Sequence, residues 1–293
     1  MSKVAWIGLG VMGYPMAGHL KASGHDVTVF NRTRAKAERW AAEHGGTIAA
    51  TPAAAAKDAE FVFACVGNDN DLREVTLGPD GLFQALEPGA VFVDHTTASA
   101  EIARALYEAA KQRSAGALDA PVSGGQSGAE TGTLTVMIGG DEADFAKAKP
   151  AIDSYAKAVN LIGPAGSGQL TKTVNQICIA GIVQGLAEAL HFGMRAGLDM
   201  EKVVATISKG AAQSWQMDNR WQTMIEGKFD YGFAVDWMRK DLAICFDEAR
   251  CNGASLPLTA LVDQFYADVQ KMGGRRWDTS SLIARLERRD PKS

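Results

Sequence analysis

The sequence predicts two domains, an α/β domain with a mostly parallel sheet followed by an all-helical domain. In the first half of the chain, short apolar runs alternate with segments whose apolar residues recur at helical spacing, which is typical of βαβ units. After Gly163 only long helical patterns follow, and a Gly-Pro-Ala-Gly segment separates the two patterns. We therefore expect one domain over residues 1–163 and a second over residues 164–293.

The expected strands are short and rich in β-branched and aromatic residues, as in strands that are buried on both faces. They are Val4–Leu9, Val27–Phe30, Phe61–Val66, Val91–Asp94, Ala117–Val122 and Leu134–Ile138. The segments between them have apolar residues three and four positions apart, which predicts helices packed against the sheet. They are Met16–Ser23, Arg34–Glu43, Leu72–Thr76 and Ala100–Gln112.

The second domain is predicted from longer segments with helical spacing and no strand run between them. They are Gln169–Ala196, Met200–Lys209, Val235–Asn252 and Leu256–Lys271. Polar residues such as Gln176, Gln184 and Glu188 interrupt the first segment, which favours a helix buried in protein over a membrane span. We expect this long helix, from about Gln169, to connect the two domains.

The composition is typical of a globular protein, with 46% hydrophobic and 22% charged residues. The formal net charge of -4 gives no bulk field that would attract nucleic acid or an anionic membrane, so we expect neither partner. The four cysteines have no paired spacing and no histidines at metal-ligand spacing, which predicts mostly buried, reduced thiols and no metal. The chain opens without a leader pattern, so we expect a cytoplasmic protein.

A glycine loop lies between the first expected strand and the first expected helix. Its residues are Gly8, Leu9, Gly10, Val11, Met12 and Gly13. Such a loop makes a tight turn, brings bare backbone close to a pyrophosphate, and points the positive end of a helix dipole toward it. In this position the loop predicts dinucleotide binding, and a merely structural glycine turn is the alternative.

The end of the second strand indicates which dinucleotide is preferred. An NAD site usually has an Asp or Glu here, which bonds the ribose 2′-hydroxyl and would repel a 2′-phosphate by on the order of 4 kcal/mol. This chain has Asn31, Arg32 and Thr33 instead, and an arginine fork suits a phosphate. We therefore expect NADP(H) to be preferred, with NAD(H) still possible.

A second glycine-rich segment lies at the end of an apolar strand. Its residues are Asp119, Ala120, Pro121, Val122, Ser123, Gly124, Gly125, Gln126, Ser127 and Gly128. Successive glycines let backbone N–H groups converge on an anion, and Ser123 adds a hydroxyl. The spacing alone equally allows a plain loop.

Lys172 is the candidate for proton transfer. Gly168, Lys172 and Asn175 are spaced i, i+4 and i+7, so they share one face of a helix, and the glycine would let a ligand approach the backbone. In the first turn of a helix, the positive end of the dipole disfavours the ammonium form, which suits a group that exchanges a proton with an alkoxide. Taken alone, such a lysine is more often a solvated surface charge.

These motifs in this order resemble the β-hydroxyacid dehydrogenase family, which includes 3-hydroxyisobutyrate dehydrogenases and the tartronate semialdehyde and glyoxylate/succinic semialdehyde reductases. The resemblance covers essentially the whole chain and includes a later Lys240-Asp241 pair. It implies a Rossmann-type domain and an all-helical domain like the C-terminal domain of 6-phosphogluconate dehydrogenase, which would make the contact of a homodimer or homotetramer. The Asn-Arg-Thr sequence is similar to that of the NADPH-using branch.

The resemblance also implies the roles of residues around the substrate. Lys172 is expected to be the general acid/base, and Asn175 is expected to orient the substrate. Ser123 and the backbone of Gly124 and Gly125 are expected to hold a substrate carboxylate.

Further residues are implied around the cofactor and the tail of the substrate. Lys240 would approach the nicotinamide end of the cofactor. Asp241 would fix the position of Lys240 and is itself expected among the substrate-binding residues. Val66 and Thr97 match positions that touch the cofactor, and Phe233 matches a position near the substrate tail.

The implied reaction is hydride transfer between NADP(H) and a small, carboxylate-bearing β-hydroxyacid and its semialdehyde or keto-acid. The loop after Ser123 is closer to the 3-hydroxyisobutyrate and tartronate semialdehyde types, whereas the cofactor motif is closer to the glyoxylate/succinic semialdehyde type, so the exact substrate stays open. One alternative is an imine reductase of similar architecture, which usually has Asp or Tyr where this chain has Lys172. The other is a non-catalytic nucleotide-binding protein.

Overall fold

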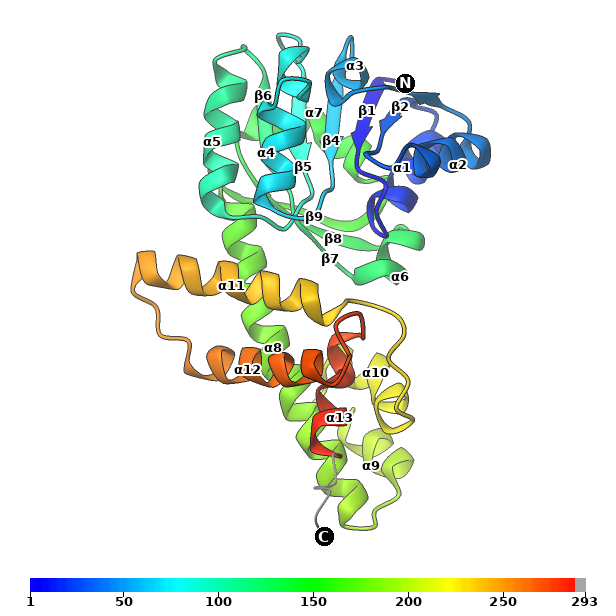
Figure 1. Cartoon of the computed structure of the whole chain (residues 1–293), viewed down its shortest axis with the longest axis vertical. Helices are drawn as coiled ribbons and strands as arrows, with labels where there is room; N and C mark the ends of the chain where they lie inside the picture. The colour runs from blue at the N-terminus through cyan, green and yellow to red at the C-terminus, as the bar shows by residue number, and fades with distance from the viewer. Residues whose placement is uncertain (288–293) are drawn as a thin grey trace. The chain divides into compact units, whose positions relative to one another are not determined.

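A computed structural model describes residues 1–287 of the chain. The chain divides into two compact units, Met1–Lys172 and Thr173–Ser293. The first unit contains a sheet with helices and the second is helical (Figure 1), which confirms the predicted fold class. The division falls inside one long helix, and the boundary predicted at residue 164 lies just before this helix begins.

The first unit is built on a sheet with the strand order β3-β2-β1-β4-β5-β6-β8-β7, in which β9 also pairs with β8. The strands are β1 (Lys3–Ile7), β2 (Asp26–Phe30), β3 (Thr47–Ile48), β4 (Phe61–Ala64), β5 (Val91–Asp94), β6 (Gly116–Asp119), β7 (Val122–Ser123), β8 (Leu134–Gly139) and β9 (Ala156–Gly163). The strands from β3 to β6 are parallel, and β8 is antiparallel to β6 and β7. The strand order reverses between β1 and β4, and sheets of this kind bind ligands outside the carboxyl ends at that point.

Helices cover both faces of this sheet. They are α1 (Gly13–Ala22), α2 (Arg34–His44), α3 (Pro52–Ala56), α4 (Asp69–Leu77), α5 (Ala100–Lys111), α6 (Gly125–Glu130) and α7 (Glu142–Ile152), with a 3-10 turn at Leu82–Gln84. Successive residues of a strand point to opposite faces, so Val4 and Trp6 join the core on the side of α1 and α7, whereas Ala5 and Ile7 join the core on the side of α4 and α5. Both faces of β1 are therefore buried, which accounts for its unbroken apolar run.

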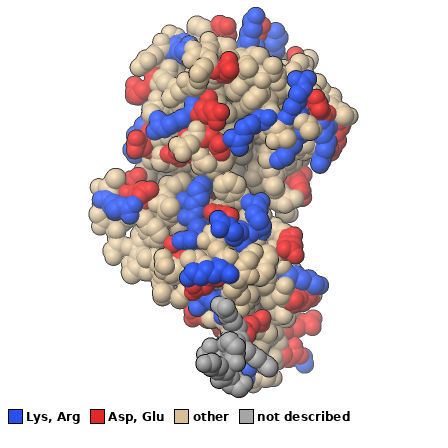
Figure 2. Space-filling view, viewed as in Figure 1, with Lys and Arg blue, Asp and Glu red and all other residues tan. Residues whose placement is uncertain are grey.

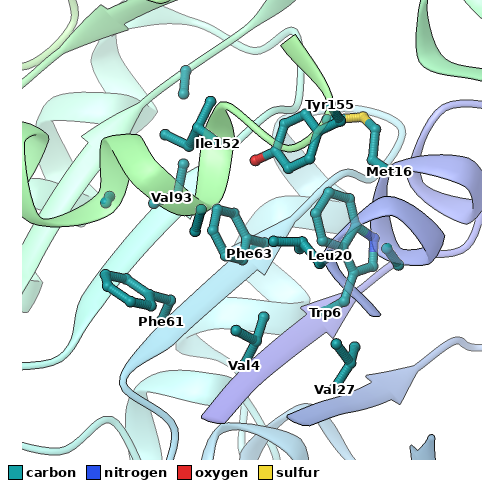
Figure 3. Close-up of a cluster of buried hydrophobic side chains, with 14 of the residues drawn as sticks. Val4, Trp6, Met16, Leu20, Val27, Phe61, Phe63, Val93, Ile152 and Tyr155 are labelled. Atoms are coloured by element: carbon teal, nitrogen blue, oxygen red, sulfur yellow. The ribbon is translucent and has the colours of Figure 1, made fainter. Parts of the chain in front are cut away.

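A buried histidine ties the carboxyl end of β5 to the aromatic core, in which Trp6, Phe63 and Tyr155 converge (Figure 3). The ring of His95 stacks on Phe63 with centroids 5.8 Å apart, and its Nδ1 lies 2.6 Å from the carbonyl oxygen of Ala120. Its Nε2 lies 2.8 Å from the hydroxyl of Tyr155. Burial lowers the pKa of His95 to about 4, so the neutral ring donates from Nδ1 to the carbonyl and accepts from the tyrosine.

The second unit consists of helices around a separate apolar core. The helices are α8 (Ser167–Arg195), which begins in the first unit, α9 (Met200–Ile207), α10 (Trp215–Ile225), α11 (Val235–Asn252), α12 (Pro257–Lys271) and α13 (Leu282–Leu286), with a 3-10 turn at Thr279–Ser281. The helix α11 ends at Gly253, whose φ of 80° is left-handed, and Pro257 opens α12. A short turn therefore joins α11 to α12.

The helix α8 has 29 residues. It begins two residues before the predicted start, because a turn closes ahead of it when the Ser167 N–H donates to the carbonyl oxygen of Pro164. Among residues 1–287, α8 is the helix that is long and apolar enough to cross a membrane, a property that core helices of globular proteins share.

Several elements are not predicted by the sequence, and the structure gives the physical reason. The helix α7 contains Pro150 and many charged residues, and no residue of β9 is fully buried, so neither has a strong apolar period. The run predicted as one strand over Ala117–Val122 forms two strands, β6 and β7, because Pro121 has no N–H to donate to a ladder.

The surface of the first unit carries interspersed acidic and basic side chains on the face visible in Figure 2. The expectation of mostly buried thiols was wrong for two of the four cysteines. Cys178 and Cys251 are exposed, because they lie on the outer faces of α8 and α11, whereas Cys245 is buried and Cys65 is half-buried. All four are thiols, as predicted.

The carboxyl group of Asp94, at the end of β5, predicts a pH dependence of stability. Burial raises the pKa of Asp94 to about 7, and the charges of Asp119 and Asp69 add to the rise, against hydrogen bonds from Thr96. The folded state therefore binds this proton more tightly than the unfolded state, and the resulting stabilisation is lost as the pH rises from about 4 to about 7.

Replacing Asp94 by Asn removes this titration. At roughly 1.4 kcal/mol per pH unit, the free energy of unfolding of Asp94→Asn minus that of the wild type should increase by about 4 kcal/mol between about pH 4 and pH 7.5. Urea unfolding at several pH values measures this difference. A difference that does not change with pH contradicts the assignment.

Candidate functional site

The glycine loop follows β1, at the point where the strand order reverses. Gly8 has a φ of +99°, and a Cβ there would lie 2.3 Å from the carbonyl oxygen of Cys65, so only glycine fits. A Cβ at Gly13 would lie 2.1 Å from the carbonyl oxygen of Gly8, which shows how closely α1 approaches the strand. At Gly10, by contrast, the Cβ position has no atom within 4 Å, and Val11 beside it is 55% exposed. This open, bare backbone fits the pyrophosphate of a dinucleotide.

The loop after β2 is joined to the glycine loop and carries an exposed cation. The Oδ1 of Asn31 accepts from the Leu9 N–H at 2.8 Å, and its Nδ2 donates to the carbonyl oxygen of Thr33 at 3.0 Å. The side chain of Arg32 is 78% exposed, and its Nη1 lies 3.1 Å from Oδ1 of Asp71 on α4. The sequence does not predict this pair, because Asp71 is 39 residues away.

The loops after β4 and β5 hold the other residues expected at the cofactor. The Val66 N–H donates to Oγ1 of Thr96 at 3.0 Å, which joins the two loops, and Thr97 is half-buried beside them. Met12 packs against the first core. Parallel strands end at one edge of a sheet, so the glycine loop, Asn31, Val66 and Thr97 all follow the same carboxyl edge.

The second glycine-rich segment is only partly a loop. Ser123 ends β7 and pairs with Thr135 of β8. Gly124 and Gly125 have φ values of +130° and +62°, which disfavour other residues, and α6 begins at Gly125. A Cβ at Gly124 would lie 3.1 Å from Leu134, whereas the Cβ position of Gly125 has no atom within 4 Å. The backbone after Ser123 is therefore open on one side.

A buried carboxylate at the end of β6 holds the start of α8. The Oδ1 of Asp119 accepts from the Gly166 N–H at 2.7 Å, and its Oδ2 accepts from the Gln169 N–H at 2.8 Å. The first N–H groups of a helix have no partner within it, so the carboxylate satisfies them and complements the positive end of the dipole. A Cβ at Gly168 would lie 2.5 Å from the carbonyl oxygens of Asp119 and Met137. The expectation that Gly168 admits a ligand was wrong, because strand backbone fills that space.

The side chain of Gln169 makes a second link between α8 and the edge of the sheet. Its Nε2 donates to the carbonyl oxygen of Thr96 at 2.7 Å, and its Oε1 accepts from the Ala98 N–H at 3.1 Å. It is 1% exposed. These bonds bracket Thr97, so the loop expected to touch the cofactor is bound to the helix that carries Lys172. The sequence does not predict that Gln169 binds this loop, because a glutamine near the start of a helix is common and indicates no particular partner.

Lys172 lies one turn after Gly168 on α8 and is 8% exposed, so it is not the solvated surface charge that the sequence also allowed. Since α8 begins at Ser167, Lys172 is in the second turn, not in the first. The predicted place of Lys172 in the first turn was therefore wrong, because α8 begins two residues earlier than predicted. Asn175 follows three residues later, so the two side chains share a face of α8.

The second unit holds a chain of polar contacts among residues expected in the site. The Nδ2 of Asn175 donates to Oε1 of Gln176 at 2.8 Å, and the Nε2 of Gln176 donates to Oδ2 of Asp241 at 2.7 Å. The Nζ of Lys240 lies 3.0 Å from Oδ1 of Asp241. Gln176 and Asp241 are 3% and 2% exposed. Gln176 was not predicted as a site residue, although it joins two residues that were, Asn175 and Asp241.

Phe233 does not belong to this chain of contacts. It lies between α10 and α11, where its N–H donates to Oδ2 of Asp278 at 2.8 Å and its ring packs against the core of the second unit. Within residues 1–287, no group of three or more His, Cys, Asp or Glu residues is placed to hold a metal ion.

Known proteins match this architecture over its whole length. A family model described as the NAD binding domain of 6-phosphogluconate dehydrogenase matches residues 3–163, and one described as NAD-binding of NADP-dependent 3-hydroxyisobutyrate dehydrogenase matches residues 166–286. The chain is 62% identical to an uncharacterized oxidoreductase of Shewanella frigidimarina (strain NCIMB 400), over 98% of this chain and 99% of that protein. It is 32% identical to the 2-hydroxy-3-oxopropionate reductase of Escherichia coli (strain K12), over 97% of each chain.

A solved structure agrees with these relatives. The 3-hydroxyisobutyrate dehydrogenase of Mycobacterium tuberculosis, solved with L-serine, has a TM-score of 0.89 and 29% identity, over 98% of this chain and 100% of that one. The glycine loop, the buried Lys172 and the family matches lead to the same conclusion. The chain belongs to the β-hydroxyacid dehydrogenase family, whose members are NAD(P)-dependent oxidoreductases that act on hydroxyacids.

Proposed function

We propose that this protein is an NADP(H)-preferring enzyme that interconverts a small β-hydroxyacid and the corresponding semialdehyde or keto-acid. The observation that carries the proposal is the place of Lys172. It is buried on α8, one turn beyond the contact with Asp119 that holds this helix at the carboxyl edge of the sheet. The same edge carries the open glycine loop. One unit of the protein therefore holds both a proton-transfer group and the loops suited to a dinucleotide.

The mechanism assigns a separate task to each residue of the site. NADPH, held by the glycine loop, would supply the hydride for the carbonyl carbon of the substrate. Lys172, as the ammonium form, donates a proton to the carbonyl oxygen as negative charge develops there, and takes the proton back in the oxidation direction. Ser123 and the N–H groups of Gly124 and Gly125 hold the substrate carboxylate. Asn175, on the face of α8 that carries Lys172, orients the oxygen that receives the proton.

Residues of α11 support these tasks. Lys240 is proposed as a cofactor-binding residue, and its ion pair with Asp241 fixes the position of its ammonium group. Gln176 in turn holds the Asp241 carboxylate. Phe233, which precedes α11 and matches a family position near the substrate tail, is proposed as a substrate-binding residue.

The preference for NADP(H) is supported by charge. No acid follows β2 directly, and Arg32 presents a mostly exposed guanidinium beside the glycine loop. A 2′-phosphate gains a charge-assisted contact there that NAD(H) cannot make. The description of the family matched by residues 166–286 also names an NADP-dependent enzyme.

The substrate class is supported by what the relatives are named for. One relative is a 2-hydroxy-3-oxopropionate reductase, and the solved dehydrogenase holds L-serine, which is itself a β-hydroxyacid. Both compounds are small and carry a carboxylate, as the proposed role of Ser123 requires.

We also propose that the protein is cytoplasmic and that it associates with further copies of itself. Large apolar side chains remain exposed on the second unit, among them Val174, Phe192, Leu258 and Leu261. Exposed apolar residues of this kind favour contact with another subunit, so the protein is proposed to be a homodimer or homotetramer.

The reaction is tested by initial rates with NADPH and with NADH across a panel of small semialdehydes, glyoxylate and cyclic imines. The proposal expects the highest kcat/KM for NADPH with a carboxylate-bearing aldehyde. Turnover of cyclic imines alone would identify an imine reductase, and absence of turnover with every compound would favour a non-catalytic nucleotide-binding protein; either result contradicts the proposal.

Replacing Lys172 by Met should lower kcat by about two to four decades, the usual range for loss of a general acid/base. The dissociation constant of NADPH, measured by fluorescence titration, should change less than about twofold, because the glycine loop is untouched. Lys202→Met is the matched control, since the side chain of Lys202 is 85% exposed on α9, and it should keep wild-type turnover. Near-normal turnover of Lys172→Met would end the proposal.

Replacing Gln176 by Leu should lower kcat/KM by about 100-fold, because small displacements of a positioned group have effects of this size. The substitution removes the donor to Asp241 and the acceptor for Asn175. The control is Gln184→Leu, which removes a buried amide of α8 that donates instead to Glu188. Both variants should lose stability in urea unfolding, but only Gln176→Leu should lose kcat/KM; equal losses in both would show that Gln176 is merely structural.

A further inference from the structure

We propose that Asp71 weakens the preference of this enzyme for NADP(H) by opposing the 2′-phosphate at Arg32. The inference deepens the proposed function and rests on it, because it concerns the preference between the two dinucleotides. The Nη1 of Arg32 lies 3.1 Å from Oδ1 of Asp71. The acid that is missing after β2 is thus replaced by an acid from α4.

The position of Asp71 is fixed by the start of α4. Its N–H donates to Oδ1 of Asn68 at 3.0 Å, and Nδ2 of Asn68 donates back to Oδ2 of Asp71 at 3.3 Å. The first bond satisfies one of the free N–H groups at the helix start, and the second holds the Asp71 carboxylate at the positive end of the helix. The Asp71 carboxylate is therefore held by Asn68, whereas the Arg32 side chain is the more exposed partner, at 78% against 27% for Asp71.

The topology puts this acid next to the cofactor loops. The loop after β4 leads into α4, and β4 and β2 are the two neighbours of β1, from which the glycine loop emerges. A phosphate that binds the Arg32 fork must share this guanidinium with the Asp71 carboxylate, and two anions beside one cation repel each other. NAD(H) has no charge at this position and meets no such repulsion.

The expected size of the effect is modest, because the pair is largely exposed to solvent and salt. Removing the charge of Asp71 should tighten NADPH binding about tenfold, which corresponds to about 1.4 kcal/mol. The wild type is therefore expected to favour NADPH over NADH by a smaller ratio of affinities than its Asn-Arg-Thr sequence alone would suggest.

The test is Asp71→Asn, which keeps the shape of the side chain and an oxygen to accept from Asn68. Dissociation constants of NADPH and NADH are measured on the whole protein by fluorescence titration, without substrate, at low and at high salt. The inference expects about tenfold tighter NADPH binding, NADH binding within about twofold of wild type, and a smaller effect at high salt. Asp153→Asn, which removes an acid from the exposed ion pair with Lys149 in the same unit, is the matched control and should change neither constant.

Two outcomes would overturn the inference. Weaker NADPH binding by Asp71→Asn would mean that Asp71 orients Arg32 for the phosphate, and equal gains for both cofactors would mean that the acid acts on a part they share. The titrations involve no substrate and no turnover. If the proposed reaction fails in the substrate panel, the cofactor titrations can still be interpreted. A failure of the proposed function is therefore distinguishable from a failure of this inference.

Discussion

The contact between the Asp119 carboxylate and the start of α8 is the interaction on which the proposed site depends. Each oxygen accepts a backbone N–H, from Gly166 and Gln169. Burial raises the pKa of Asp119, and these hydrogen bonds oppose the rise. The same contact brings α8 so close to the strand ends that only glycine fits at position 168, and it fixes the place from which Lys172 projects.

Around this contact, neutral side chains bind the loops of the carboxyl edge to one another. His95 bridges Ala120 and Tyr155, and Gln169 brackets the loop that contains Thr97. Buried polar groups that are fully hydrogen-bonded stiffen a structure, because each would pay a desolvation cost if it moved away from its partner. The cofactor loops and the first turn of α8 are therefore bound to one another, which suits a reaction that requires close alignment of hydride and proton transfer.

The sequence predicts the structural features that a local pattern determines. It does not predict contacts between residues that are far apart in the chain. The parallel strands are predictable because strands that are buried on both faces appear as unbroken apolar runs. The glycine loop is predictable because its glycines lie between such a run and a helical pattern. Gln176 and Asp71 are not, because their partners Asp241 and Arg32 lie 65 and 39 residues away and nothing in the local pattern pairs them. The space beside Gly168 was misjudged for the same reason, since the backbone of Asp119 and Met137, far from it in the sequence, fills that space.

Amide hydrogen exchange in the wild type and in Asp119→Ala tests the central claim most directly. Hydrogen bonds to a charged group are worth about 1.5–3 kcal/mol, so exchange at the amides of Gly166 and Gln169 should become at least about tenfold faster in the variant. Exchange in β1, on the far side of β4, should stay slow. Unchanged protection at Gly166 and Gln169, or a uniform loss over the whole first unit, would contradict the account.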